Sequence, residues 1–346
     1  MWVKALLLRN FRSYGDAQFQ FSPQNNLIIG PNARGKTTIL EAIYLLITGR
    51  SFRSNNLDEL VKEGEDGFYV ELHYENQGID HSIRYIYEKK QRRIFANRHP
   101  CKSLSDLLGL LQGALLLPDD IQLIKGAPKQ RRKYLDLQLA QMNPLYVHHL
   151  TRYFRAMRQR NALLKMHSER AIELFETEMA SSGAYLIEER ERIVALLTQD
   201  CTEVQEALSC GKEAVSLKYV PKYQPKDLLE QYRKMRSREM KTGSSMVGPH
   251  LDDLSLKLGN QEAKLYASEG QKKSLTTALK FAEWNQLKAH SDTTPLMLID
   301  DVGVSLDASR REKLISLLDG FSQVFVTSTE PLQFSSSSRD TEQVKL

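Results

Sequence analysis

The chain has 346 residues, of which 41% are hydrophobic and 26% charged, and its formal net charge is +5 at pH 7. This length allows one large domain or two ordinary ones, and so small a net charge is weak evidence for a polyanionic partner. Three cysteines without a Cys-x-x-Cys pair argue against a disulfide framework and a zinc site. No apolar run approaches the roughly 18 residues that span a bilayer, and residues 1–21 lack a signal-peptide pattern. Composition therefore predicts a soluble cytoplasmic protein.

Short stretches rich in β-branched and aromatic residues fill the N-terminal part of the chain. Their alternation of apolar and polar residues predicts strands, and the polar residues between them predict turns. Residues 3–9 and 17–21 flank a turn, while 26–29 is a short apolar strand that ends at Gly30. Three more strands, at 68–74, 82–87 and 92–97, are expected to form an antiparallel sheet.

The segment Gly30-Pro-Asn-Ala-Arg-Gly-Lys-Thr37 fits the phosphate-loop pattern G-x-x-x-x-G-K-[ST], and it lies between an apolar strand and a helix with an apolar face. In such a loop backbone N–H groups surround phosphates, Lys36 neutralises the β- and γ-phosphates, and Thr37 offers its hydroxyl to Mg²⁺. The alternative is a glycine-rich turn before an ordinary helix. The expected ATP-binding residues are Gly30, Pro31, Asn32, Ala33, Arg34, Gly35, Lys36, Thr37 and Thr38.

Helical periodicity dominates from about residue 103 to about residue 208, interrupted by the apolar run 114–117. Between Lys125 and Arg170, eleven Lys and Arg residues stand against two acids, a local excess of nine charges. Such a run is either a solvated helical face or a contact surface for nucleic-acid phosphates. The candidate DNA contacts are Arg131, Arg132, Lys133, Arg152, Arg155 and Arg158.

Strands and helices alternate in the C-terminal part, which predicts a parallel sheet. The expected elements are strands at 215–219 and 254–258, a helix at 271–287 with a strand at 295–299, and a helix at 308–318 with a strand at 323–327. The predicted fold is α/β, and its first domain combines residues 1–103 with residues 212–333. A helical domain is inserted at 104–211, and the serine-rich segment 334–346 is predicted to be a flexible tail.

An apolar strand that ends in two carboxylates, Asp300 and Asp301, occupies residues 295–301. Asp300 is positioned to hold Mg²⁺, directly or through water, and Asp301 to polarise an attacking water. Strands often end in Asp, so this pattern becomes informative only together with the phosphate loop. We expect Lys36, Asp300 and Asp301 to be catalytic, with Thr37 and Asp300 as magnesium ligands.

The segment Ser268-Glu-Gly-Gln271 precedes a helix and has two interpretations. Ser-x-x-Gln is a capping box, in which Ser268 caps the helix and Gln271 reaches back. A capping box leaves Gly270 unexplained, because glycine in the first turn lowers helix propensity by up to about 1 kcal/mol. Glycine is favoured there if a large group must approach the backbone, as an anion would at a helix N-terminus.

These motifs occur in a distinctive order: phosphate loop, helical insertion, Ser-x-Gly-Gln, Asp-Asp, then Ser305-Leu-Asp307. The order resembles the ATPase heads of the ABC type, including those of SMC proteins, and is most similar to the bacterial DNA-repair members of that family. The resemblance also covers 8–14, 40–44, 49–53, 124–128 with 131–132, 247–250 with 252–253, and 278–283.

The resemblance implies an ABC-type P-loop ATPase head with mixed sheets, which uses ATP and Mg²⁺ and forms an ATP-dependent homodimer. In that family the Ser-x-Gly-Gln segment closes on the γ-phosphate held by the other subunit, a role that falls here to Ser268, Gly270 and Gln271. The implied dimer and switch residues are Asp307, Thr327 and Thr329. The implied partners are single- and double-stranded DNA, gap junctions and other proteins of recombinational gap repair.

Three positions depart from the family pattern. Arg34 stands where Gln or another small polar residue is expected, and Val304-Ser-Leu-Asp307 stands in place of Ser-Glu-Leu-Asp. Leu251 replaces an expected Arg, which removes a possible polar contact. None of these departures alters Lys36 or Asp300.

Three functions are compatible with these features. The first is an ATP-gated DNA clamp with slow, DNA-stimulated ATP hydrolysis, supported by the motif set and the basic helical segment. The second is a nucleotide-switched binding module with negligible turnover, since ABC heads commonly have Glu where Asp301 stands. The third is the ATPase subunit of a membrane transporter, which would need a membrane partner and normally lacks the basic insertion.

Overall fold

The computed structural model describes residues 1–209, 213–301, 308–332 and 341–346. Contacts between residues divide the chain into two compact units. The first unit comprises Met1–Asp120, Val204–Lys212 and Ser268–Leu346, and the second comprises Ile121–Glu203 and Glu213–Ala267. No helix in the described ranges is long and apolar enough to cross a membrane.

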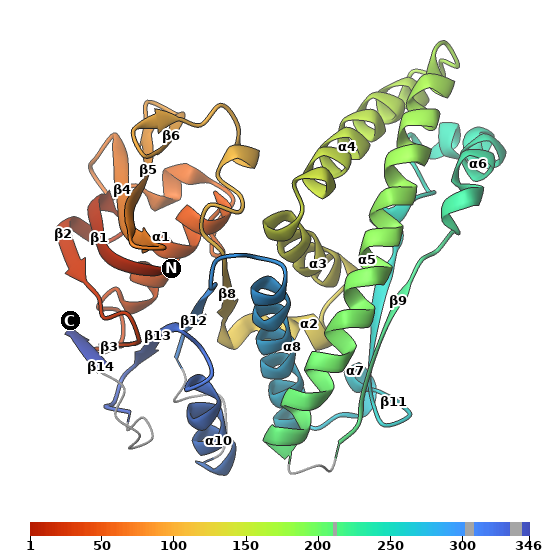
Figure 1. The fold of residues 1–346 in the computed structure, drawn as a ribbon. Helices are drawn as coiled ribbons and strands as arrows, with labels where there is room; N and C mark the ends of the chain where they lie inside the picture. Colours follow the sequence, from red (N-terminus) through yellow and green to blue (C-terminus); the bar gives the residue numbers. More distant parts are fainter. Residues whose placement is uncertain (210–212, 302–307, 333–340) are drawn as a thin grey trace. The chain divides into compact units, whose positions relative to one another are not determined.

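The first unit contains two sheets (Figure 1). The six-stranded sheet is antiparallel, in the order β2 (Tyr14–Gln20), β1 (Trp2–Phe11), β4 (Gly67–Asn76), β5 (Ile79–Glu88), β6 (Gln91–Ala96) and β7 (His99–Pro100). The five-stranded sheet is parallel, in the order β14 (Thr341–Lys345), β3 (Asn25–Ile29), β13 (Gln323–Ser328), β12 (Leu296–Ile299) and β8 (Gly113–Leu116). Short 3-10 helices η1 (Leu57–Leu60), η2 (Leu104–Asp106) and η3 (Pro118–Ile121) connect these elements.

Helix α1 (Lys36–Thr48) lies between the two sheets and is buried along nearly its whole length. Alternate residues of β12 pack on opposite sides of the parallel sheet: Leu296 and Leu298 join the core around α1. Met297 and Ile299 instead pack with side chains of α8 (Glu269–Ala289) and α10 (Ala308–Leu318). Helices on both faces explain why the central strands β12 and β13 are buried along their whole length.

The second unit is mainly helical, with α2 (Gln122–Lys125), α3 (Pro128–Met142), α4 (Pro144–Lys165), most of α5 (Ile172–Ser209), α6 (Leu228–Thr242) and α7 (Ala263–Tyr266). Its small antiparallel sheet has the order β11 (Gln261–Glu262), β10 (Asp253–Leu258) and β9 (Val215–Val220). Two 3-10 helices, η4 (Pro225–Asp227) and η5 (Pro249–Leu251), complete it. The fully buried Arg160 of α4 pairs with Glu176 of α5 at 2.9 Å and with Glu239 of α6 at 2.6 Å, which joins the three helices.

The parallel sheet is present as predicted, but three segments differ from the expectations. Most of the apolar run 114–117 lies in strand β8, which ends at Leu116, and the described part of the predicted flexible tail contains β14 over 341–345, while 334–340 lie outside the described residues. The polar segment Thr341–Lys345 pairs along the outer edge of β3, where backbone hydrogen bonds hold a strand with little side-chain burial. The predicted helical insertion covered 104–211, whereas the second compact unit also takes 213–267, because α6 packs on α4 and β10 on α3.

Candidate nucleotide site

The phosphate loop connects β3 to α1, and its last turn requires glycine at position 35. Gly35 has φ 95° at the helix N-cap, a left-handed conformation that disfavours side chains. A Cβ atom there would lie 2.7 Å from the Tyr14 hydroxyl oxygen. Ala33 also has a positive φ, 65°. The backbone therefore turns back on itself before the helix, as an anion-binding loop does.

Lys36 is buried within the loop that it closes. Its Nζ donates hydrogen bonds to the carbonyl oxygens of Gly30, at 2.6 Å, and Pro31, at 2.9 Å. The ammonium group is thus held at the centre of the loop, where phosphate oxygens can replace the two carbonyls.

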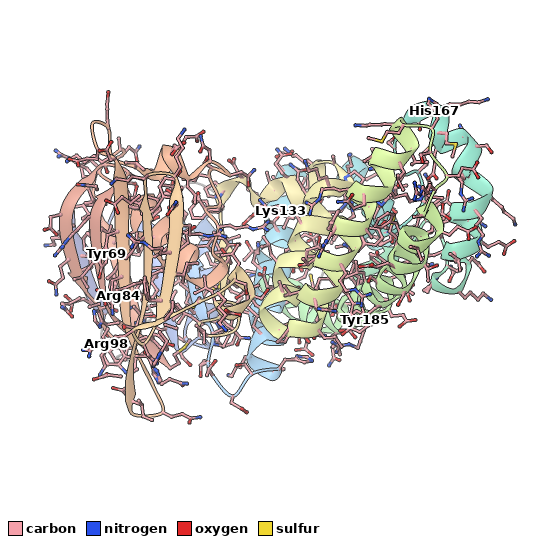
Figure 2. The ribbon with its side chains drawn as sticks, turned by 90° about the horizontal axis from the view of Figure 1, so that it is seen from above. Tyr69, Arg84, Arg98, Lys133, His167 and Tyr185 are labelled. Atoms are coloured by element: carbon pink, nitrogen blue, oxygen red, sulfur yellow. The ribbon has the colours of Figure 1, made fainter. Side chains whose placement is uncertain are left out.

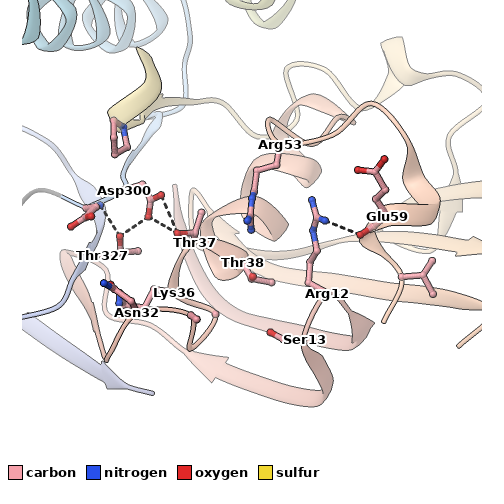
Figure 3. A pocket seen from close by; sticks show the side chains of 15 residues that line it. Arg12, Ser13, Asn32, Lys36, Thr37, Thr38, Arg53, Glu59, Asp300 and Thr327 are labelled. Atoms are coloured by element: carbon pink, nitrogen blue, oxygen red, sulfur yellow. Dashed lines mark hydrogen bonds between the residues drawn. The ribbon is translucent and has the colours of Figure 1, made fainter. Parts of the chain in front are cut away.

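A cluster of three side chains joins the loop to two neighbouring strands (Figure 3). The Thr37 hydroxyl lies 3.0 Å from each carboxylate oxygen of Asp300, at the end of β12. The Thr327 hydroxyl, from β13, donates to Asp300 Oδ1 at 2.6 Å and accepts the backbone N–H of Asp301 at 2.8 Å. The structure therefore brings together Thr37 and Asp300, the expected magnesium ligands, with Thr327.

This cluster has the chemistry of a magnesium site. Hydroxyl and carboxylate oxygens are hard ligands, and Mg²⁺ is commonly held by one or two protein groups together with water and substrate phosphates. The Thr37 hydroxyl and the Asp300 carboxylate supply such a pair beside the phosphate loop.

Asp301 has an unusual environment. Its φ is 53°, in the left-handed region, and its buried Oδ1 has no hydrogen-bond partner within the described residues. Burial raises the pKa of this carboxyl, and Asp300 raises it further, while Lys36 acts in the opposite direction. Backbone strain, an unsatisfied oxygen and a shifted pKa in one pocket residue together mark a candidate for proton or water chemistry.

A cavity of about 570 Å³ contains the loop and the carboxylates, a size typical of small-molecule sites. Its lining residues are Arg12, Ser13, Asn32, Ala33, Gly35, Lys36, Thr37, Thr38, Arg53, Glu59, Val61, Pro118, Asp300, Asp301 and Thr327. Arg12 and Arg53 were not predicted as site residues from the sequence, although both lie in the stretches that resemble the ATPase heads, 8–14 and 49–53.

Glu41 of α1 holds both arginines in place and was also missed. Its carboxylate is fully buried, pairs with Arg12 through two hydrogen bonds of 2.6 and 3.0 Å, and accepts the Ser51 hydroxyl. Arg53 lies 3.7 Å away. A carboxylate in the middle of an apolar helix is the sequence signal that could have identified this cluster, since such a group needs buried cations.

Ser268 caps α8, and the predicted capping box is confirmed. Its hydroxyl accepts the backbone N–H of Gln271 at 3.2 Å, and the Gln271 side chain accepts the backbone N–H of Ser268 at 2.7 Å. Ser268 is exposed and, like Gly270 and Gln271, is absent from the lining of the cavity. Thr329 is exposed just beyond β13, and Arg34 is exposed in the phosphate loop. Val304, Ser305 and Asp307 lie outside the described residues, and Leu251 ends η5 in the second unit.

Two of the six candidate DNA contacts have structural roles instead. Arg131 is buried and pairs with Asp253 through hydrogen bonds of 2.7 and 2.9 Å. Arg132 is half-buried and donates to the carbonyl of Asp252. Asp253 neutralises Arg131 from far away in the sequence, and counting charges in a local window cannot find such an acid. Lys133, Arg152, Arg155 and Arg158 are exposed.

Comparisons with known proteins agree along the whole chain. The model of the RecF/RecN/SMC N-terminal domain family matches residues 2–345. The DNA replication and repair protein RecF of Protochlamydia amoebophila is 42% identical over 341 residues, which cover 96% of this chain and 95% of that protein. The corresponding protein of Chlamydia abortus is 35% identical over 337 residues, 95% of this chain and 92% of that one.

Solved structures show the same fold. The recombination mediator RecF of the RecFOR pathway, solved with ATP, has a TM-score of 0.89 and 30% identity, covering 98% of this chain and 93% of that one. An Smc head bound to the C-terminal winged-helix domain of ScpA has a TM-score of 0.56 and 17% identity, over 96% of this chain and 90% of that one. The α/β class and the ABC-type ATPase head predicted from the sequence are therefore confirmed.

Proposed function

The chain belongs to the RecF group of the RecF/RecN/SMC family, and from this membership we propose that it is an ATP-driven DNA clamp of replication and recombinational gap repair. The observation that carries the proposal is the cluster of Thr37, Asp300 and Thr327, in which residues 263 positions apart meet beside the phosphate loop. Solved RecF structures with ATP support the same assignment.

In this proposal the loop N–H groups and Lys36 bind the β- and γ-phosphates of ATP. Mg²⁺, held by Thr37 and Asp300, would neutralise phosphate charge when bound. Asp301 orients the attacking water and accepts its proton, while Thr327 keeps Asp300 in position. Arg12 and Arg53 contact the nucleotide from the opposite side of the cavity.

The second half of each site comes from another subunit. Ser268 and the backbone of Gly270 and Gln271 close on the γ-phosphate held by the partner, and Asp307, Thr327 and Thr329 take part in the dimer contact and the switch. The exposure of Ser268 and its absence from the lining of the cavity support this arrangement. Hydrolysis is slow and stimulated by DNA, and it opens the dimer and releases DNA.

We propose that the dimer binds single-stranded DNA, double-stranded DNA and gap junctions through phosphate contacts. It acts with RecO and RecR to help load RecA onto single strands coated by single-strand-binding protein, in the cytoplasm. Solved RecF structures assigned to the RecFOR pathway support these partners. The relatives are DNA replication and repair proteins, which argues against a transporter subunit.

Sizing the protein with ATP, with ADP and without nucleotide tests the proposal. We expect a dimer only with ATP and its loss in Ser268→Arg, because a bulky cation would occupy the position of the partner's phosphate. An unchanged ATP-dependent dimer in this variant would contradict the role of Ser268 across the interface.

A nucleotide-switched binding module with negligible turnover is the second candidate. Its support is Asp301, whose side chain is one methylene shorter than the Glu common in ABC heads. Multiple-turnover ATP hydrolysis, with and without DNA, separates the two functions. Turnover that Asp301→Asn abolishes while ATP-driven dimerisation persists favours the enzyme, whereas no turnover in the wild type favours the switch.

A further inference from the structure

A second concentration of positive charge lies on the antiparallel sheet of the first unit. Residues 89–102 contain six Lys and Arg residues and no acid. These residues, named here the basic hairpin, are Lys89, Lys90, Arg92, Arg93, Arg98 and Lys102, and all are exposed. Arg93 pairs with Glu88 at 3.3 Å, whereas Lys89, Lys90, Arg98 and Lys102 form no ion pair with another described residue. None of the six lines the nucleotide cavity.

The tips of the basic hairpin carry cations at strained backbone positions. Lys89 and Lys90, between β5 and β6, have φ 50° and 61°, and Arg98, between β6 and β7, has φ 71°. Two-residue turns of this left-handed kind favour Asn-Gly, since other side chains cost free energy there. The equivalent turn between β4 and β5 has glycine, Gly78, in its second position. Lysine and arginine at positions that favour glycine cost folding free energy, which indicates that their positive charge has a function.

On the outer face of the same sheet, arginine side chains lie beside aromatic rings. Arg84 lies with its guanidinium carbon 6.0 Å from the ring centre of Phe95, and Arg9 lies 5.8 Å from that of Tyr69. Tyr69, Arg84 and Arg98 follow one another along this sheet in Figure 2. Glu71 also lies on this face and pairs with Arg84 at 3.3 Å. Surfaces that bind nucleic acids combine cations with aromatic rings, whereas a face that is only solvated needs no aromatic rings.

We propose that the basic hairpin and the adjoining sheet face bind the phosphate backbone of DNA. This inference rests on the proposed function and adds a contact surface separate from the exposed Arg152, Arg155 and Arg158 of α4. The six residues of β6 separate the two tips by about 20 Å, the length of roughly six base pairs of duplex. An extended polyanion can reach both tips, whereas a single phosphate group cannot.

Substitutions in the turns can remove positive charge without destabilising the fold, which gives a clean test. The triple variant Lys89→Asn/Lys90→Gly/Arg98→Gly removes three charges and supplies the Asn-Gly pair that each turn favours, because position 97 is already Asn. Gln77→Asn makes the same improvement at the β4–β5 turn without a charge change. Both proteins should therefore unfold at or above the wild-type temperature.

The probe is a fluorescein-labelled DNA duplex, titrated by anisotropy with ATP and Mg²⁺ at several NaCl concentrations. The slope of log affinity against log salt should fall by up to about three for each bound subunit of the triple variant, with weaker binding, and stay unchanged in Gln77→Asn. ATP turnover without DNA should match the wild type in both.

An unchanged slope in a stable triple variant would show that the tip cations are only solvated turn residues and overturn the inference. If the triple variant binds DNA like the wild type but no longer binds a labelled polyglutamate peptide, the surface binds an acidic protein. That result would also overturn the inference. If the wild type binds no DNA with ATP, the proposed function fails, and that outcome is distinct because it precedes any comparison of variants.

Discussion

Asp301 combines two features that oppose folding in one residue. A left-handed conformation in a residue other than glycine costs about 1–3 kcal/mol, and a buried acceptor without a partner costs a similar amount. Both occur here: φ is 53°, and Oδ1 has no hydrogen-bond partner among the residues that the structure describes. Such unfavourable conformations persist only where the surrounding structure enforces them, and they are common at functional sites.

Asp301→Asn should therefore separate chemistry from binding. We expect ATP turnover to fall by roughly 100-fold or more, since a general base is lost. ATP affinity and thermal stability should be retained, because Asn tolerates the left-handed conformation and carries no charge to desolvate. Single-turnover hydrolysis, equilibrium nucleotide binding and thermal unfolding measure the three quantities. Turnover close to that of the wild type would remove Asp301 from the mechanism.

The same carboxylate predicts how turnover depends on pH. Burial and the neighbouring Asp300 raise the pKa of Asp301, so its protonated form appears at higher pH than for an exposed aspartate. Because the deprotonated form is the base, turnover should fall as the pH drops through the raised pKa. Nucleotide binding over the same pH range is the control, since a parallel loss of binding would mean that another group causes the fall.

Glu41 should contribute to both stability and nucleotide binding. Glu41→Gln leaves the Arg12 guanidinium without its buried counter-charge, and breaking such a pair costs about 3–5 kcal/mol. Urea unfolding should show this loss, and nucleotide affinity should fall because Arg12 and Arg53 lose their orientation. Glu59→Gln is the matched control: the backbone carbonyl of Glu59, and not its side chain, accepts from Arg12. Equal unfolding of the two variants would contradict the role given to Glu41.

At the scale of single elements, the N-terminus of α8 carries the Ser268 cap and a proposed contact across the dimer, and one substitution can separate the two. Ser268→Asp keeps an acceptor for the capping bond and adds a negative charge that the helix N-terminus favours. The free energy of unfolding should therefore stay within about 0.5 kcal/mol of the wild type. The ATP-dependent dimer should nevertheless be lost, because in the proposed dimer the new charge would repel the partner's γ-phosphate.

Ser268→Ala provides the opposite comparison, since it removes the cap without adding charge. It should cost about 1 kcal/mol of stability while permitting some dimerisation. Urea unfolding and sizing with ATP measure both effects. A stable Ser268→Asp protein that still forms the ATP-dependent dimer would leave Ser268 with the capping role alone.

Elements with a strong local pattern were predictable, and those held mainly by distant partners were not. The phosphate loop, Asp300 after its strand and the Ser268 cap each follow from a few adjacent residues. Strand β14 has polar side chains, and its pairing with β3, more than three hundred positions earlier in the chain, gives no local signal. The Glu41 cluster likewise becomes visible only when Arg12, Ser51 and Arg53 meet in the fold.

At the scale of the whole molecule, the number of Lys and Arg residues between 125 and 170 overstates the positive charge that this segment exposes. Two of the eleven cations between residues 125 and 170, Arg131 and Arg160, are buried and paired with acids that lie elsewhere in the sequence. Arg131→Ala should therefore destabilise the second unit by about 1–3 kcal/mol, because the carbonyl oxygens of Leu123 and Gly126 lose their donor, whereas Asp253 stays in contact with solvent. Urea unfolding measures this loss.

Exposed cations should instead affect DNA binding. Substituting them should lower the salt dependence of binding more in a dimer than in a monomer. Arg155 and Arg158 are exposed on α4, and each phosphate contact contributes about 0.9 to the slope of log affinity against log salt. Arg155→Ala/Arg158→Ala should lower that slope by about two in an ATP-free monomer. In an ATP-closed dimer the reduction should be about four, because both chains carry the two substitutions. Urea unfolding should be unchanged. Equal reductions with and without ATP would mean that DNA contacts only one subunit, and the clamp model would fail.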